Sequence, residues 1–315
     1  MTAPPATPTP PTSTAVGRRV SWQAGVSLLV MVCAGYLAHR HWPVIEAGAA
    51  RLAVADRGWL LVATVATVAT WACSALAQQG AVSRSLPARR LVAVQFAASA
   101  ANHLLPAGLG AGAVNLRFLT RCGLPIARSA TALAVKATAG TVVRGGLIAV
   151  LALACPGVLH VPHVSVTAVV VTVTVIALAA VLLKGPLRRA LRAVLADVRA
   201  VHELPARAAA LWGGSLAFAS LHTAVVIAVT QAVDLPLPPA QVALAYLAAS
   251  SAAVLLPTPG GLGSLDAALA LALTLAGAPA GAAASVVLGY RLLTVWLPLL
   301  PGLLALGVLV RRRVV

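Results

Sequence analysis

Long apolar runs with few charges are the feature that most constrains this chain. Residues 127–153, 208–233 and 280–310 each exceed the roughly 20 residues that a helix needs to cross the apolar core of a bilayer. A backbone in lipid must satisfy its own hydrogen bonds, so such runs form helices even where Val and Thr favour strands. The sequence therefore predicts an all-α, polytopic membrane protein.

Composition supports this fold class. Of the 315 residues, 60% are hydrophobic and only 9% are charged, whereas soluble globular domains carry about 25% charged residues. With further runs at 20–38, 58–79 and 164–183, we expect about six full spans, the last of them bent at Pro298 and Pro301. Residues 1–17 are rich in Pro and Thr and predict a disordered tail before a single transmembrane domain over 18–315.

Two Pro/Gly breaks interrupt apolar sequence, at 104–110 and at 255–266. The helices beside each break are too short to cross a bilayer, so we expect two re-entrant hairpins of half-helices, over 88–122 and 244–276. Irregular backbone survives in a membrane only where protein or a water-filled cavity surrounds it, which predicts a binding site near the midplane. The break residues are Pro106, Gly108, Gly110, Pro257, Pro259, Gly260, Gly261 and Gly263.

Positive charge predicts the orientation. The net charge of +17 comes mostly from Arg residues in short loops, which mark the cytoplasmic side and do not require a nucleic-acid partner. We expect a multi-pass protein of the cell membrane with both termini cytoplasmic. The Arg-rich segments that then share the cytoplasmic face, besides the chain start, are 84–90, 117–128, 184–207 and 311–313.

The same orientation predicts an internal repeat. The two hairpins would open from opposite sides, which makes residues of about 58–153 and about 208–310 inverted repeats. Gly108-Leu109-Gly110 aligns with Gly261-Leu262-Gly263, and the similarity is weak elsewhere. Inverted repeats with broken helices are how many transporters provide access from both sides.

Four charged residues lie deep in these apolar segments: Lys136, Arg144, Arg291 and Asp266. Lys136 and Arg144 are eight residues apart, a little over two helical turns, so we expect them to project broadly the same way. A charge at such depth costs a few kcal/mol and by default marks a ligand site or pathway, with snorkelling as the alternative. Asp266 either pairs with Arg291 or complements the dipole of a half-helix that Ser264 caps. One acid does not neutralise three cations, so we expect a cationic cavity that binds a phosphate head group.

Enzyme motifs are absent. The four cysteines form no CxxC pair, and there is no HExxH, GxSxG or Walker-type loop. Only six acidic residues are available as general bases. We therefore expect no enzymatic activity, no metal and no cofactor.

The segment from Pro257 to Leu269, followed by Tyr290 to Pro298, resembles the lysylphosphatidylglycerol synthase transmembrane-region family, also called flippase-like integral membrane proteins. Asn102 to Gly110 resembles an earlier family element, and the similarity covers most of residues 20–310. Larger members carry a cytoplasmic aminoacyltransferase domain, and their membrane region is thought to move its lipid product. Nothing follows residue 315, so we expect a stand-alone member without synthase activity.

This resemblance adds Asn102, Arg117 and Tyr290 to the candidate head-group residues. The chain also departs from the family. Asp266 stands where Glu is usual, Ala111 follows Gly110 where Glu is usual, and Lys136 lies where an acid is common. These departures make the cavity more cationic and favour an anionic lipid.

The predicted function is therefore translocation of an anionic or modified phospholipid, or of a glycolipid carrier, with membrane phospholipids as ligands. The main alternative is a non-transporting scaffold that holds a lipid-modifying enzyme through the 184–207 loop. A membrane enzyme acting on a head group and a small-solute transporter with the same architecture are further alternatives.

Overall fold

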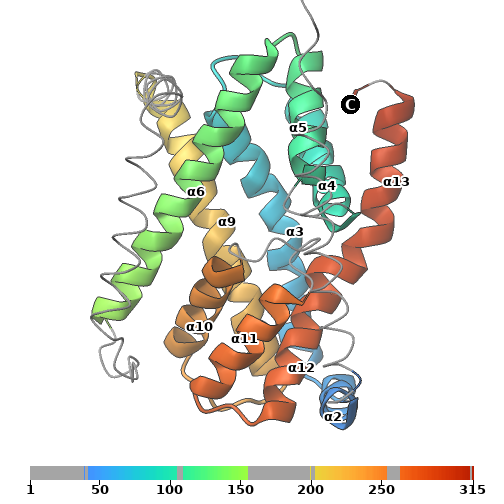
Figure 1. The fold of residues 1–315 in the computed structure, drawn as a ribbon, viewed down its shortest axis with the longest axis vertical. Helices are drawn as coiled ribbons and strands as arrows, with labels where there is room; N and C mark the ends of the chain where they lie inside the picture. The colour runs from blue at the N-terminus through green and yellow to red at the C-terminus, as the bar shows by residue number, and fades with distance from the viewer. Residues whose placement is uncertain are drawn as a thin grey trace, which may run out of the picture.

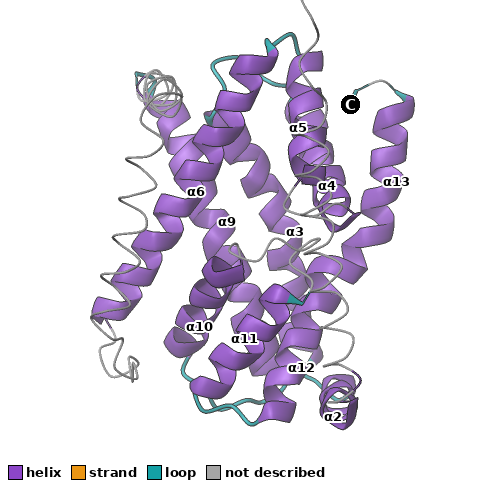
Figure 2. Ribbon diagram, in the orientation of Figure 1, coloured by secondary structure: helices purple, strands orange, loops and turns teal. Residues whose placement is uncertain are grey.

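The computed structural model describes residues 42–104, 109–154, 203–253, 263–312 and 314–315, together with His39 and Arg199. Within these residues every regular element is a helix (Figure 2). The expected tail 1–17 and the expected spans 20–38 and 164–183 lie outside the described residues. The helices are α2 (Trp42–Ala53), α3 (Arg57–Gly80), α4 (Ala88–Leu104), α5 (Leu109–Arg121), α6 (Ile126–Ala154), α9 (Pro205–Ala232), α10 (Pro239–Ala252), α11 (Ser264–Leu275), α12 (Ala280–Arg291), the π-helical turn η5 (Leu292–Trp296) and α13 (Leu297–Arg311).

Four of the expected spans are confirmed as helices that are long and apolar enough to cross a membrane. They are α3 with 24 residues, α6 with 29, α9 with 28, and the continuous α12–η5–α13 segment with 32. At 1.5 Å per residue, even the shortest of them reaches across the roughly 30 Å apolar core. The described part of the chain therefore builds a multi-pass helical membrane protein.

The last span departs from the prediction in one respect. The sequence places its bend at Pro298 and Pro301, but the irregular backbone is the π-helical turn at Leu292–Trp296, just before them. Pro298 has no N–H to donate to the carbonyl of Thr294 four residues earlier, and its ring crowds that carbonyl. The turn absorbs this conflict, and the axis changes direction between α12 and α13 (Figure 1).

Helices α3 and α9 form the central pair of the molecule (Figure 1). Small residues let their backbones approach closely, as is common between membrane helices. A Cβ built on Gly214 of α9 would lie 2.6 Å from the amide nitrogen of Ala77 in α3, and one on Gly80 would overlap the backbone of Leu211. The contact therefore requires glycine at both positions.

Two pairs of short helices flank this centre. Helices α4 and α5 pack together at one end of the molecule, and α10 and α11 pack together at the other end (Figure 1). The pairs occupy matching positions: α4 packs on α3 and α13, while α10 packs on α9 and α6. The break residues Pro106, Gly108, Pro257, Pro259, Gly260 and Gly261 lie outside the described residues.

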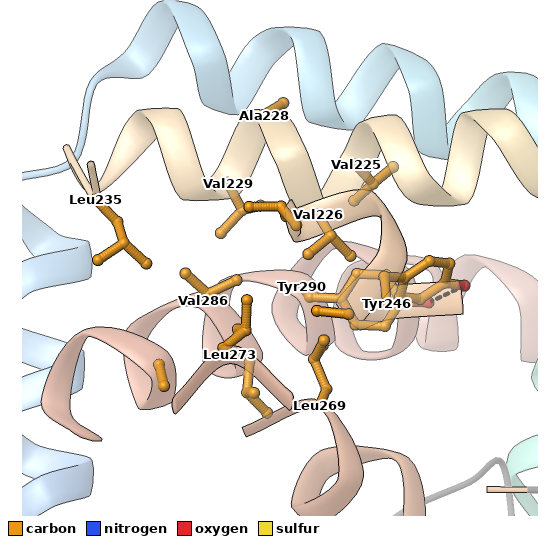
Figure 3. Close-up of a cluster of buried hydrophobic side chains, with 14 of the residues drawn as sticks. Val225, Val226, Ala228, Val229, Leu235, Tyr246, Leu269, Leu273, Val286 and Tyr290 are labelled. Carbon is orange, nitrogen blue, oxygen red and sulfur yellow. Dashed lines mark hydrogen bonds between the residues drawn. The ribbon is translucent and has the colours of Figure 1, made fainter. Parts of the chain in front are cut away.

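The largest apolar core lies around α10, α11 and α12 (Figure 3). Val225, Val226 and Val229 of α9 face Val286 of α12 and Leu273 of α11 within this core. A second core joins α4, α5 and α13 through residues that include Phe118 and Leu119. Between these two cores lie the polar side chains of the candidate site.

Candidate functional site

Lys136 is the centre of a hydrogen-bonded network that joins four helices. From α6 its Nζ donates to Ser74 Oγ of α3 at 2.9 Å and to Gln95 Oε1 of α4 at 3.0 Å. The Gln95 amide nitrogen donates to Asn115 Oδ1 of α5 at 2.6 Å. Every partner of the ammonium group in this network is uncharged, so its positive charge is solvated by dipoles but not neutralised.

A cavity of about 370 Å³ lies beside this network, between α3, α5, α6 and α9. Lys136 and Arg144 both line it, which confirms the expectation that side chains eight residues apart on one helix project the same way. Small and apolar residues such as Ala77, Leu133 and Phe218 form much of the remaining wall. Its volume lies within the roughly 300–1,000 Å³ of small-molecule sites. We call it the first cavity.

Gln78 gives the first cavity an unsatisfied polar group. The side chain is fully buried, lines the cavity, and neither its Nε2 nor its Oε1 has a hydrogen-bond partner. A buried amide without partners costs on the order of 1–3 kcal/mol, so such groups are rare unless a ligand or water satisfies them. Gln78 therefore points to an occupant of this cavity.

The N-terminus of α5 lies at the same cavity. Ala111 and Gly112, in the first turn of this helix, line the wall opposite α6. The first N–H groups of a helix have no partner within the helix, and its dipole places partial positive charge there. Together with Lys136 and Arg144, this end gives the first cavity a positive potential, which is the chemistry that anion sites use.

A second cavity of about 250 Å³, also lined by Lys136, lies among α3, α4, α5 and α9. The two cavities share lining residues, including Ser74, Asn115, Lys136 and Phe218. The second cavity has more polar walls than the first, and it reaches Asn102 of α4, His222 of α9 and Thr294 of η5. Lys136 therefore lies at the boundary between two connected spaces.

Arg291 is held in a different way. Its Nε donates to Asp266 Oδ1, and the Asp266 side chain also accepts from the backbone N–H of Gly263 at 2.8 Å through Oδ2. The Arg291 side chain is 8% exposed and that of Asp266 is 30% exposed. Both roles that the sequence left open for Asp266 are realised, because one oxygen pairs with Arg291 while the other completes the start of α11.

The expectation that Ser264 caps α11 is wrong. Ser264 is the first helical residue, and Gly263 takes the cap position with φ of +84°. This left-handed conformation suits glycine and is strained for other residues. It directs the Gly263 N–H toward Asp266, whose carboxylate accepts from the cap residue as the third helical residue of a capping box does.

A chain of polar rings lies beside Arg291. The hydroxyl groups of Tyr246 in α10 and Tyr290 in α12 are 3.2 Å apart, as the dashed line in Figure 3 marks. The Tyr290 hydroxyl also lies 3.4 Å from Nδ1 of His222, which lines the second cavity. Arg144 is close enough to act electrostatically on all three rings. These contacts link α10 and α12 to the cavities.

The structure does not bring all predicted site residues into one cavity. Lys136 and Arg144 line the first cavity, and Asn102 lines the second. Arg291, Asp266 and Tyr290 line neither, although Tyr290 contacts His222 of the second cavity. Arg117 is exposed and also lines neither cavity. Of the break residues that the structure describes, Gly110 packs closely against the backbone of Ala101 and Asn102, and Gly263 caps α11.

Sequence reasoning missed the uncharged members of the site, which are Ser74, Gln78, Gln95 and Asn115. A signal for three of them was present, because Gln78, Gln95 and Asn115 are large amides inside otherwise apolar helices. Such groups in membrane helices face other helices or a cavity, where they find partners. Apart from the residues that the family resemblance added, only charged residues in the apolar segments were considered, so these amides were not identified.

Comparison with known proteins gives one result. The family model described as "Lysylphosphatidylglycerol synthase TM region" matches residues 23–302. This match includes every helix from α2 to α12 and all residues of the two cavities. No curated protein matches the sequence.

Proposed function

The chain belongs to the lysylphosphatidylglycerol synthase TM region family, and from this premise we propose that it translocates an anionic phospholipid across the membrane. The observation that carries the proposal is the first cavity, in which Lys136 and Arg144 face a buried and unpartnered Gln78 amide. A lipid phosphate would supply negative charge for the two cations and an acceptor for Gln78 Nε2.

The charge of the cavity favours an anion. Among the described residues that line it, Lys136 and Arg144 are charged and none is a carboxylate. A cation at membrane depth costs a few kcal/mol without a counter-ion. The uncharged partners of Lys136 reduce that cost without cancelling the charge. A bound phosphate would supply the missing negative charge, with the start of α5 adding free N–H groups.

The shape of the site suits a lipid more than a small solute. The apolar residues of the first cavity give the glycerol and upper acyl carbons of a lipid a wall to pack against. Helix α6, which carries both cations, is the least buried of the long helices. A lipid can approach such a helix from the bilayer with its tails still in the apolar core.

We place the two short pairs, α4–α5 and α10–α11, as re-entrant hairpins in inverted repeats. Their helices have 17, 13, 14 and 12 residues, fewer than the roughly 20 that a span requires. The matched packing of α4 and α10 on the long helices supports the repeat. In this arrangement both termini are cytoplasmic, as the positive loops predict.

Transport is preferred to catalysis because neither described cavity lining has a carboxylate that could act as a general base. The scaffold alternative relied on the segment 184–207, most of which lies outside the described residues. A scaffold would keep its function after loss of the cavity cations. A lipid translocator would lose its function, so substitution of Lys136 and Arg144 distinguishes the two hypotheses.

The test is translocation of fluorescent phospholipids in liposomes that contain the purified protein. Phosphatidylglycerol and phosphatidylcholine carry the same reporter, and the variants are Lys136→Met and Arg144→Gln. Each variant removes a charge-assisted contact worth about 1.5–3 kcal/mol, so we expect phosphatidylglycerol movement to fall about 10- to 100-fold. Arg128→Gln is the matched control, because Arg128 lies on α6 as Lys136 and Arg144 do, is exposed, and lines neither cavity.

Three results would contradict the proposal. One is equal movement of the anionic and the zwitterionic lipid by the wild type. Another is unchanged phosphatidylglycerol movement in folded Lys136→Met and Arg144→Gln. The third is a wild-type protein that is folded and moves neither lipid, which would favour the scaffold.

A further inference from the structure

The second cavity differs from the first in the chemistry of its walls. Hydroxyl and amide side chains dominate it, and Trp71 and Phe218 add aromatic faces. Its volume is about 250 Å³. The hydroxyl and amide residues that the argument uses are Thr67, Thr70, Ser74, Ser99, Asn102 and Thr294.

Charge is scarce in this cavity. Its described lining contains no carboxylate and no Arg, and its titratable side chains are Lys136 and His222. The Lys136 ammonium already donates to Ser74 and Gln95. A head group with its own ammonium would find no counter-ion in this cavity, so binding would cost the free energy of desolvating a charge. The lining therefore disfavours a cationic or zwitterionic head group.

The side-chain oxygen atoms that line the second cavity can still accept hydrogen bonds. The hydroxyl groups of Thr67 and Thr70 donate to backbone carbonyls of α3, at 2.8 and 2.6 Å. Their oxygens keep lone pairs, and so does the buried Oδ1 of Asn102, which has no partner. Hydroxyl groups, the common neutral donors of lipid head groups, can donate to these acceptors without bringing a second positive charge beside Lys136.

The residues that the two cavities share indicate where a hydroxyl-bearing head group would lie. Both cavities include Lys136, so a phosphate bound at Lys136 borders the first and the second cavity. Resting on the proposed function, we propose that the second cavity binds the uncharged polyol of a phosphodiester lipid, such as glycerol or a single sugar. The protein thereby selects lipids by hydroxyl groups beyond the phosphate.

The test compares two lipids of equal net charge in the liposome assay. Phosphatidylglycerol carries a polyol, and phosphatidylserine carries an ammonium and a carboxylate. We expect phosphatidylglycerol to move at least about fivefold faster, the factor that one neutral hydrogen bond of about 1 kcal/mol provides. Thr70→Val keeps the side-chain shape but removes the acceptor, and should bring the ratio of the two rates close to one.

Thr64→Val is the matched control, because Thr64 lies on α3, donates to the backbone in the same way, and lines neither cavity. It should keep the wild-type ratio. If the wild type moves phosphatidylserine as fast as phosphatidylglycerol, the polyol site is wrong while anionic translocation stands. A ratio that Thr70→Val leaves unchanged also overturns it. If neither anionic lipid moves, the proposed function itself fails, and the polyol site with it.

Discussion

Lys136 and Arg291 are both cations inside apolar helices, yet the molecule holds them in opposite ways. Arg291 contacts a carboxylate that is itself fixed by a backbone N–H at the start of α11. Lys136 contacts only uncharged oxygens in the described network, and it lines two cavities. Arg291 is thus neutralised within the protein, whereas no partner in the described network neutralises Lys136.

The difference indicates that the cations of the two halves, α3–α4–α5–α6 and α10–α11–α12, have different roles. The α10–α11–α12 half uses its cation as a structural tie between the start of α11 and the end of α12. The α3–α4–α5–α6 half uses its cation at a space large enough for a ligand. Loss of charge should therefore reduce stability in one half and transport in the other.

The largest effect is expected for Asp266→Ala. It leaves the buried Arg291 guanidinium without its carboxylate and the Gly263 N–H without its acceptor. Breaking a buried pair by removing one partner costs about 3–5 kcal/mol, and the partial exposure of Asp266 places this case near the lower end. Thermal unfolding in detergent, followed by circular dichroism, would show a lowered Tm.

Lys136→Met is the comparison variant for that measurement. After the substitution Gln95 Oε1 still accepts from the Ser74 hydroxyl at 2.9 Å, so no buried acceptor is orphaned. We expect a loss below about 1 kcal/mol. If Lys136→Met lowers Tm as much as Asp266→Ala does, the proposed division between a structural and a functional cation is wrong.

A smaller effect is expected for Gly110→Ala. A Cβ at Gly110 would overlap the carbonyl of Ala101, so α4 and α5 would have to separate. Overpacking of this kind costs about 1–3 kcal/mol. Gly112 lies two residues further along the same helix, and a Cβ built there meets nothing within 4 Å. Gly112→Ala should therefore be neutral or slightly stabilising in the same unfolding experiment. Equal Tm values for the two variants would show that the α4–α5 contact is not close.

A smaller effect than that of Gly110→Ala is expected for Tyr290→Phe. It removes the hydroxyl that lies between Tyr246 and His222 but keeps the ring in the core (Figure 3). The loss should be about 1 kcal/mol, since each partner is left with one contact fewer. If Tyr290→Phe lowered Tm as much as Asp266→Ala does, the hydrogen bonds among Tyr246, Tyr290 and His222 would stabilise the α10–α11–α12 half as much as the ion pair does.

Much of this architecture was predictable from the sequence. Apolar runs predicted the four described spans because lipid leaves the backbone no alternative to a helix. The spacing of Lys136 and Arg144 predicted that they share a cavity, since helix geometry alone decides which residues share a face. The ion pair of Asp266 with Arg291 was one of two roles left open, and the structure contains both.

The remainder depended on packing that sequence patterns do not encode. The network around Lys136 joins residues 74, 95, 115 and 136, which meet only because four helices converge. The separation of Arg291 from the cavities follows from the position of α11 relative to α12. The π-helical turn before Pro298 reflects a local conflict whose resolution depends on neighbouring helices.

The most direct test of the account is whether a phospholipid occupies the first cavity. Photoreactive phosphatidylglycerol would be crosslinked to the protein in liposomes and the sites mapped by mass spectrometry. We predict adducts in segments 111–115 and 133–144 that are lost in the Lys136→Met, Arg144→Gln double variant. Adducts confined to the exposed residues Val150 and Leu153 of α6, and unchanged in the double variant, would contradict the account.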